Sequence, residues 1–397
     1  MEQPATALIN DPMAVFAFLA GIVALVFWLS ELPRLRGFFE VVPPVIFVYF
    51  VPMLTTTAGI TPGASPVYDW SSRYLLLFAL LLLMVSVDVR SILKLGGMAL
   101  FMVAAGTVGI IIGGPVSLLI FQNWLPADAW TGFAALSGSW IGGTANMVAI
   151  AESVGTSADA MGPVIVVDTV VGYGWMGVLI AMVGLQRRYD RRTRARTAAV
   201  EETNRRLEVL TREQRPLTLR DAVVMIGMGM ACAVAVSWLG RQLPAAGDPT
   251  IISSTTWSVL IVVTGGLALS FTPVRRLELA GASNLGYTAL YLLLAGIGAK
   301  ADLRAVLETP LYLAAGAVWI AIHVAVLLIA ARIVRAPLFF VATGSMANIG
   351  GAVSAPVVAG VYHRAMAPVG LLMAVAGYIL GIYGALACAY LLGQVGG

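Results

Sequence analysis

Long apolar runs fill most of this sequence and leave it few ways to fold. A membrane-spanning helix needs about 20 predominantly apolar residues, and runs near that length recur along the whole chain. Only 11% of the residues are charged, against about 25% in a soluble domain. The sequence therefore predicts an all-α polytopic membrane protein with about twelve transmembrane helices. The runs lie at 13–29, 41–59, 74–87, 95–121, 129–151, 160–186, 222–240, 249–274, 279–299, 309–331, 336–361 and 365–393.

One strongly basic stretch, residues 187–220, separates the sixth run from the seventh. It holds 11 of the 24 Lys and Arg residues, and basic loops stay on the cytoplasmic side of a membrane. We therefore predict a cytoplasmic linker between a first membrane repeat, 1–186, and a second, 221–397, in a multi-pass protein of the inner (cytoplasmic) membrane. The net charge of +4 does not indicate nucleic-acid binding. No signal-peptide cleavage site follows the first run, so we expect that run to remain as a helix.

The two halves resemble each other in three places, in the same order along the chain. Such duplication is usual in secondary transporters, in which two related bundles move around a central site. The basic residues favour inverted repeats, because Arg332 and Arg335 precede the second glycine-rich segment whereas residues 122–128 contain no basic residue. Six crossings in each half would instead make the repeats parallel, so we expect one segment to be miscounted. The matches are Asp88-x-Arg90 with Asp302-x-Arg304, 137–155 with 343–362, and 161–184 with 366–389, which aligns Gly172-Tyr173 with Gly377-Tyr378.

A glycine-rich polar motif is the most distinctive local feature of each half. Glycine costs about 1 kcal/mol relative to alanine inside a helix, so paired glycines with Ser, Thr and Asn at membrane depth predict an interrupted helix. Backbone groups freed there can bind ions or polar solutes. Close helix packing without a break is the alternative. The predicted substrate-binding residues are Gly138, Ser139, Gly142, Gly143, Gly344, Ser345, Asn348, Gly350 and Gly351.

Asp168 is the one acidic residue inside an apolar run. A carboxylate at that depth is costly and by default indicates an ion or proton path. It lies one segment after the first motif, where it can face Thr144 and Asn146, and hard cations prefer such oxygen ligands. We predict a site for Na⁺ or a proton at Asp168, Thr144, Asn146 and Thr169, with a structural, hydrogen-bonded aspartic acid as the alternative. We interpret His323 as a packed, hydrogen-bonded histidine.

With GSWIGGTAN at 138–146 and GSMANIGG at 344–351, the chain resembles membrane proteins of the YjcL type over nearly its full length. That family is grouped with the cation/proton antiporters and bile-acid:sodium symporters. The resemblance implies inverted repeats, a panel and a core domain, and an elevator-type movement. It also implies two discontinuous helices, 129–151 and 336–361, that cross in the core, and it suggests a homodimer. Many antiporters carry an acidic pair or Asn-Asp where this chain has Val167-Asp168-Thr169, which favours symport of an organic solute.

The leading hypothesis is an ion-coupled (Na⁺ or H⁺) secondary active transporter of a small organic solute, with membrane lipid as its surroundings. A cation/proton antiporter is the alternative within transport. A passive channel and a membrane-embedded sensory or structural protein are the alternatives from other classes. The sequence contains no HExxH, GxSxG or Walker A motif, so we predict neither an enzyme nor a cofactor beyond the coupling ion.

Overall fold

The computed structural model describes residues 7–41, 44–207, 215–247, 250–301, 309–363 and 366–396. Helices form most of this part of the chain, and its only strand-like feature is an isolated bridge between Ala246 and Ile252. The predicted all-α class is confirmed. A helix suits lipid because it satisfies its backbone hydrogen bonds within one segment.

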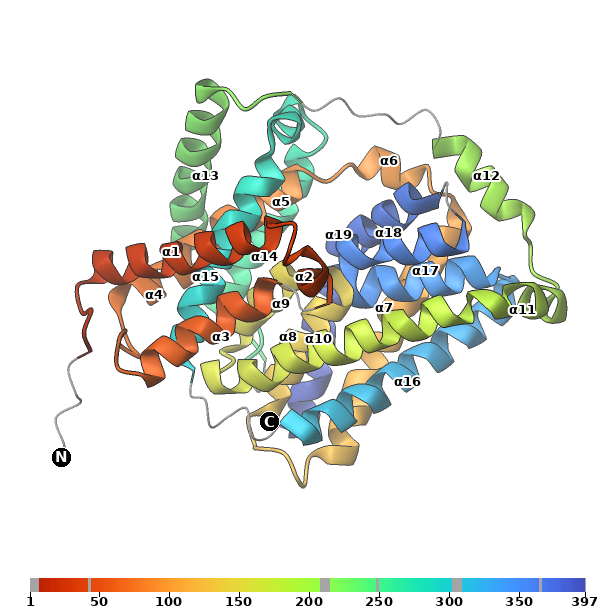
Figure 1. Cartoon of the computed structure of the whole chain (residues 1–397), viewed down its shortest axis with the longest axis horizontal. Coiled ribbons are helices and arrows are strands. Elements are labelled where there is room, and N and C mark those ends of the chain that lie inside the picture. The colour runs from red at the N-terminus through yellow and green to blue at the C-terminus, as the bar shows by residue number, and fades with distance from the viewer. Residues whose placement is uncertain are drawn as a thin grey trace.

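The long helices pack as two groups that lie beside each other (Figure 1). The scaffold group consists of α1 (Pro12–Glu31), α3 (Pro44–Thr57), α4 (Pro66–Trp70), the π-helical turn η1 (Ser71–Leu75), α5 (Leu76–Val85), α13 (Leu219–Gly240), α14 (Ser254–Leu269) and α15 (Ala282–Lys300). The hairpin group consists of α7 (Gly97–Phe121), α8 (Ala129–Gly142), α9 (Thr144–Val154), α10 (Ala158–Ala181), α16 (Thr309–Val334), α17 (Leu338–Ile349), α18 (Gly351–Tyr362) and α19 (Ala367–Gly396). The short connecting helices are α2 (Arg36–Val41), α6 (Val89–Leu93), η2 (Met182–Leu185), α11 (Gln186–Thr193), α12 (Ala198–Leu207) and η3 (Pro273–Ala280).

Fewer helices can cross a membrane unaided than the apolar runs suggested. Within the described residues, eight helices are long and apolar enough, or nine if Ser254–Leu269 and Pro273–Ala280, bent by 95°, count as one span. The expected number of about twelve is therefore not confirmed. The shortfall falls on the run at 41–59, where α3 has 14 residues, and on the two glycine-rich runs.

The first glycine-rich run folds back on itself. Gly143 separates α8 from α9 and has a φ of +78°, which L-residues with a side chain rarely adopt. A Cβ placed on Gly138 would lie 3.0 Å from the Cα of Met147, so α9 doubles back along α8. The outer ends also meet, because Thr156 Oγ1 donates to the Thr131 carbonyl at 3.0 Å. We call residues 129–154 hairpin 1.

The second run folds back in the same way. Gly350 separates α17 from α18, which pack against each other, and Gly351 has a φ of +61°. The Leu338 amide, where α17 begins, donates to Asp190 Oδ1 at 2.9 Å. The Tyr362 hydroxyl, where α18 ends, donates to the Leu179 carbonyl at 2.8 Å. We call residues 338–362 hairpin 2. The expected interruptions within 129–151 and 336–361 are present at Gly143 and Gly350. The expectation that these runs are crossing helices is wrong, since each run returns to the end from which it came.

The two hairpins open at opposite ends of the molecule. Hairpin 2 opens beside the C-terminal end of α10, where α11 of the basic linker lies, and we call this the linker end. Hairpin 1 opens beside the N-terminal end of α10. The 24 residues of α10 separate the two openings by about 36 Å at 1.5 Å a residue. That length matches the thickness of a bilayer.

Glycines on α7 bring it close to α16 within the hairpin group. His323 packs against Gly106 and Gly109, and Trp319 packs against Gly113 and Gly114. A Cβ added to any of these glycines would lie 3.2 Å or less from the histidine or tryptophan that packs against it. The Trp319 indole donates to the Ile110 carbonyl at 2.9 Å. Small residues at this spacing are the usual device for close helix packing in lipid.

The repeated Asp-x-Arg motif is described only in the first half. Asp88 caps α6 by accepting from the Ser91 amide at 3.2 Å, and it pairs with Arg275 at 2.7 Å. These contacts make Asp88 a structural residue at the linker end. Asp302 and Arg304 lie outside the described residues.

Candidate functional site

The tips of the two hairpins meet at one tyrosine of α19. A Cβ placed on Gly143, at the tip of hairpin 1, would lie 3.3 Å from Tyr378 Cε1. A Cβ placed on Gly351, at the tip of hairpin 2, would lie 3.8 Å from the Tyr378 hydroxyl. The interrupted helices therefore bring their ends to a single place between the two openings.

Asn146 occupies the inside of the hairpin 1 tip and is 1% exposed. Its amide nitrogen donates to the Gly142 carbonyl at 3.1 Å and lies 3.4 Å from the Tyr378 carbonyl. A Cβ at Gly142 or at Gly381 would lie less than 2 Å from this nitrogen, so only glycine fits on either side. Its buried Oδ1 has no hydrogen-bond partner in the structure. An unpaired amide oxygen at this depth is a candidate cation ligand, because burying it without a partner costs about 1–3 kcal/mol.

Asp168 joins α10 to hairpin 1. The Ser139 hydroxyl, on α8 one turn before the tip, donates to Asp168 Oδ1 at 2.9 Å. The predicted partners Thr144 and Asn146 are not hydrogen-bonded to the carboxylate; they lie on α9, beyond the break at Gly143. Thr169 donates to the Ile165 carbonyl of its own helix at 2.9 Å. The predicted ion site thus divides into an Asp168–Ser139 pair and the tip around Asn146.

Hairpin 2 is held by a continuous hydrogen-bond chain that includes Ser345, one of the predicted substrate residues. The Trp175 indole donates to Ser345 Oγ at 2.9 Å, and Ser345 Oγ lies 2.9 Å from His323 Nε2. His323 Nδ1 lies 3.0 Å from the Gly106 carbonyl, which can only accept. Nδ1 therefore carries a proton, and in the neutral imidazole the Ser345 hydroxyl donates to Nε2. The interpretation of His323 as a packed, hydrogen-bonded residue fits this geometry.

Asn348 is fully buried and fully paired. With its amide oxygen toward Thr107 Oγ1 at 3.0 Å, its nitrogen donates to the carbonyls of Gly344 at 3.0 Å and Val103 at 3.1 Å. Asn348 and Ser345 therefore fix hairpin 2 to α7 and α16 in this conformation and offer no free polar atom to a solute. Gly350 lies at the break between α17 and α18 and shapes the tip.

The sequence interpretation missed two tyrosines that mark where the tips lie. Tyr378 touches both tips and its hydroxyl lies 3.2 Å from the Tyr287 hydroxyl of the scaffold helix α15. Tyr173, its counterpart in the first half, lies near Asp168 and Ser354. The repetition of Gly172-Tyr173 as Gly377-Tyr378 in the sequence could have identified both tyrosines as candidate site residues.

Hairpin 1 thus carries two polar sites: the Asp168–Ser139 carboxylate–hydroxyl pair on its α8 arm, and the tip itself, with an unpaired amide oxygen and interrupted helix ends. Oxygen ligands of this kind suit Na⁺ or a proton, and interrupted helix ends suit polar solute groups. Within the described residues, no group of three or more His, Cys, Asp or Glu residues is placed to hold a metal ion.

Two comparisons with known proteins place the chain in a family, and one of them matches a membrane protein. A family model described as "Protein of unknown function (DUF819)" matches residues 17–395. The chain is also similar to the "Uncharacterized membrane protein YjcL" of Bacillus subtilis (strain 168), with 26% identity over 339 residues. The alignment covers 83% of this chain and 85% of that protein.

Proposed function

The chain belongs to the DUF819 family of proteins of unknown function, and we propose that it is an ion-coupled secondary active transporter of a small organic solute in the inner (cytoplasmic) membrane. The observation that carries this proposal is the meeting of two oppositely opening hairpins beside Asn146 and Asp168. Interrupted helices at mid-membrane depth, with a carboxylate beside them, are how secondary transporters build their sites, and Asp168 is partly buried against hairpin 1.

We infer an inverted repeat from the same geometry. If neither hairpin crosses the membrane, each half contributes five crossings: α1, α3, α4–α5, α7 and α10 in the first, then α13, α14, α15, α16 and α19 in the second. An odd number of crossings per half inverts the second half relative to the first. The miscounted segments are then the two glycine-rich runs, and the basic linker lies on the cytoplasmic side.

The coupling ion is proposed to bind at Asp168 and Asn146, with Ser139, Thr144 and Thr169 nearby. The solute is proposed to bind where the tips meet, against Gly143, Gly351 and Tyr378. In this conformation Ser345 and Asn348 hold hairpin 2 in place through their partners on α7, α10 and α16. We therefore assign them to positioning the second tip.

The division into two helix groups supports an elevator-type movement, in which the hairpin group slides against the scaffold as a core domain against a panel domain. Polar contacts between the groups include the Tyr287–Tyr378 hydroxyl pair at 3.2 Å and the Tyr49 hydroxyl on the Ala158 carbonyl at 2.7 Å. Such contacts can break and re-form at moderate cost, because a hydrogen bond contributes about 1 kcal/mol net.

Proteoliposome uptake tests the proposal. Radiolabelled organic acids, amino acids and sugars are supplied under an inward Na⁺ or proton gradient, and we expect concentrative, saturable uptake of one class. Asp168→Asn should abolish gradient-driven uptake, because it removes the charge that couples ion to solute. Asp128→Asn, an exposed acid at the mouth of hairpin 1, is the matched control and should transport normally. Undiminished coupling in Asp168→Asn would refute the ion site.

The same vesicles discriminate the competing functions. A cation/proton antiporter would exchange Na⁺ for protons with no organic solute present. A channel would give flux that does not saturate and that no gradient of a second ion drives.

A further inference from the structure

A polar cavity of about 260 Å³ lies at the end of the molecule opposite the linker, and it contains none of the residues at the hairpin tips. Most of its lining comes from the scaffold: α4, η1, α5, α13, α14 and α15. Glu152 of α9 completes it from the hairpin group. The cavity therefore lies where hairpin 1 meets the scaffold.

Three basic side chains converge on this cavity: Arg73, Arg241 and Lys300. On the five-crossing topology proposed above, these are the only Lys or Arg residues in the described part of the chain that fall on the side opposite the linker. The positive-inside rule disfavours basic residues on the outer side of a membrane. Their collection around one cavity is therefore better explained by a ligand than by topology.

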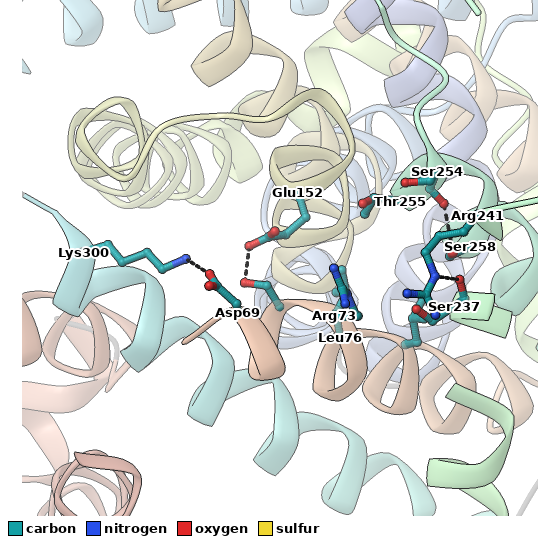
Figure 2. A pocket seen from close by; sticks show the side chains of 12 residues that line it. Asp69, Arg73, Leu76, Glu152, Ser237, Arg241, Ser254, Thr255, Ser258 and Lys300 are labelled. Atoms are coloured by element: carbon teal, nitrogen blue, oxygen red, sulfur yellow. Dashed lines mark hydrogen bonds and ion pairs between the residues drawn. The ribbon is translucent and has the colours of Figure 1, made fainter. Parts of the chain in front are cut away.

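The acidic residues of the cavity do not neutralise both arginines. Figure 2 shows the Lys300–Asp69 pair on one side, Arg241 on the other, and Arg73 and Glu152 between them. Lys300 Nζ lies 3.2 Å from Asp69 Oδ1, and the Ser72 hydroxyl donates to Glu152 at 2.8 Å. Arg241 uses its Nε on the Ser237 carbonyl at 3.3 Å. Among the described residues, no carboxylate forms an ion pair with Arg73 or Arg241.

Hydroxyl groups surround these guanidinium groups. Ser237, Ser254, Thr255 and Ser258 line the same cavity. The Ser258 hydroxyl already donates to the Ser254 carbonyl at 2.9 Å, so the further hydroxyl donors are Ser237, Ser254 and Thr255. Guanidinium groups bind carboxylates and phosphates through paired, charge-assisted hydrogen bonds, and hydroxyls add further donors. The cavity thus presents the donors that an oxyanion requires.

We propose that this cavity binds the carboxylate of a small organic acid, and that it is the outer entry site for the transported solute. The inference rests on the proposed function and narrows its solute to organic anions. A phospholipid phosphate shares the same chemistry, but its acyl chains need an apolar surface beside it. The apolar lining here consists of Leu76 and Leu77, which are 0% and 2% exposed, so we assign the site to a soluble anion.

Binding to the purified full-length protein in phosphatidylcholine nanodiscs tests this inference. Acetate, lactate, succinate and citrate are titrated while the unfolding temperature is followed, since a ligand that binds the folded state stabilises it by mass action. We expect at least one of the four acids to stabilise the wild type. Arg241→Gln should weaken its apparent affinity about tenfold, the loss expected from one charge-assisted hydrogen bond, and Arg73→Gln/Arg241→Gln should remove the effect.

Controls separate this site from folding, from lipid and from the coupling site. Arg188→Gln, an exposed arginine of the linker, should bind as the wild type does, and all variants should share its unfolding temperature without ligand. Asp168→Asn should keep acid binding even where coupled uptake fails, so that the two proposals fail separately. Equal stabilisation of the double variant, or no stabilisation of the wild type by any of the four acids, would overturn the inference. A lipid ligand would also overturn it: phosphatidylglycerol would then displace the acid, and native mass spectrometry would show this lipid bound to the wild type but not to the double variant.

Discussion

At the scale of residues, the tip of hairpin 1 depends on glycines, because the space where their side chains would lie is occupied by Asn146. The Asn146 amide nitrogen fits between Gly142 of its own hairpin and Gly381 of α19, where a Cβ would overlap it. Gly143 supplies the backbone conformation that reverses the chain. The asparagine is thereby fixed with one oxygen unpaired. The position of the Asn146 side chain is therefore set by the space that Gly142 and Gly381 leave for it, more than by its own hydrogen bonds.

Gly381→Ala is expected to disrupt this tip. The added methyl group would overlap the Asn146 amide, and overpacking of this kind costs about 1–3 kcal/mol. We expect a lower unfolding temperature in detergent and loss of ion-dependent stabilisation. Gly177→Ala, on α10 with no atom within 4 Å of the new Cβ, is the control and should behave as the wild type. If both variants responded to ions alike, the tip would not hold the ion.

His323 and His363 offer a matched pair for the hydrogen-bond chain of hairpin 2. His323 is buried and paired at both nitrogens, whereas His363 is exposed. His323→Leu leaves the Gly106 carbonyl and the Ser345 hydroxyl without their partner, at a cost of about 1–3 kcal/mol. We expect His323→Leu to lower the unfolding temperature and His363→Leu to leave it unchanged. Equal unfolding temperatures in the two variants would contradict the assigned hydrogen bonds.

At the scale of elements, the reversal of each glycine-rich run changes the topology of the whole chain. A broken but crossing helix would place its two ends on opposite sides of the membrane. Hairpin 1 instead keeps its ends together, with Ser157 Oγ 3.2 Å from Asp128 Oδ2. The distribution of basic residues favours inverted repeats, whereas an even number of crossings per half would make the repeats parallel. Counting the two runs as hairpins leaves an odd number per half and removes this conflict.

Cysteine accessibility tests the hairpin directly. In a background that carries Cys232→Ser and Cys388→Ala, single Asp128→Cys and Ser157→Cys variants flank hairpin 1. We expect a membrane-impermeant thiol reagent to label both in intact cells. Arg188→Cys, in the linker, should be labelled only after permeabilisation. Labelling of positions 128 and 157 from opposite sides would show that the segment crosses.

At the scale of the molecule, transport by an elevator-type movement requires the hairpin group to slide past the scaffold. Hairpin 1 contacts the scaffold where the Ser253 hydroxyl, which caps α14, donates to the Ser153 carbonyl at 3.0 Å. Glu152 is next to this contact and lines the outer cavity. A solute bound there would lie at the boundary between the scaffold group and the hairpin group.

A disulfide across that boundary should stop transport. In the same cysteine-free background, Ser153→Cys with Ser253→Cys joins hairpin 1 to α14, and we expect oxidation to block uptake and reduction to restore it. Ala246→Cys with Ile252→Cys joins two facing residues within one scaffold loop and should leave uptake unchanged when oxidised. Full uptake by the oxidised Ser153/Ser253 pair would contradict the proposed movement.

The sequence by itself determined the class of the protein and the position of its unusual segments. Apolar run length fixes a helical membrane protein because lipid cannot satisfy an open backbone, and the glycine motifs located both chain reversals at Gly143 and Gly350. Asp168 was predicted to face Thr144 and Asn146, whereas its hydrogen-bond partner in the structure is Ser139; its role in ion binding stays a prediction.

Tertiary structure alone decided the path of the chain after each break and the partner of each polar group. A glycine pair permits either a kinked crossing or a reversal, and the choice depends on contacts with distant helices: Gly381 and Tyr378 of α19 at one tip, Thr107 and His323 at the other. The same contacts satisfied Asn348 and left Asn146 with an unpaired oxygen. Local sequence encodes that a helix can break, whereas long-range packing sets the direction it then takes.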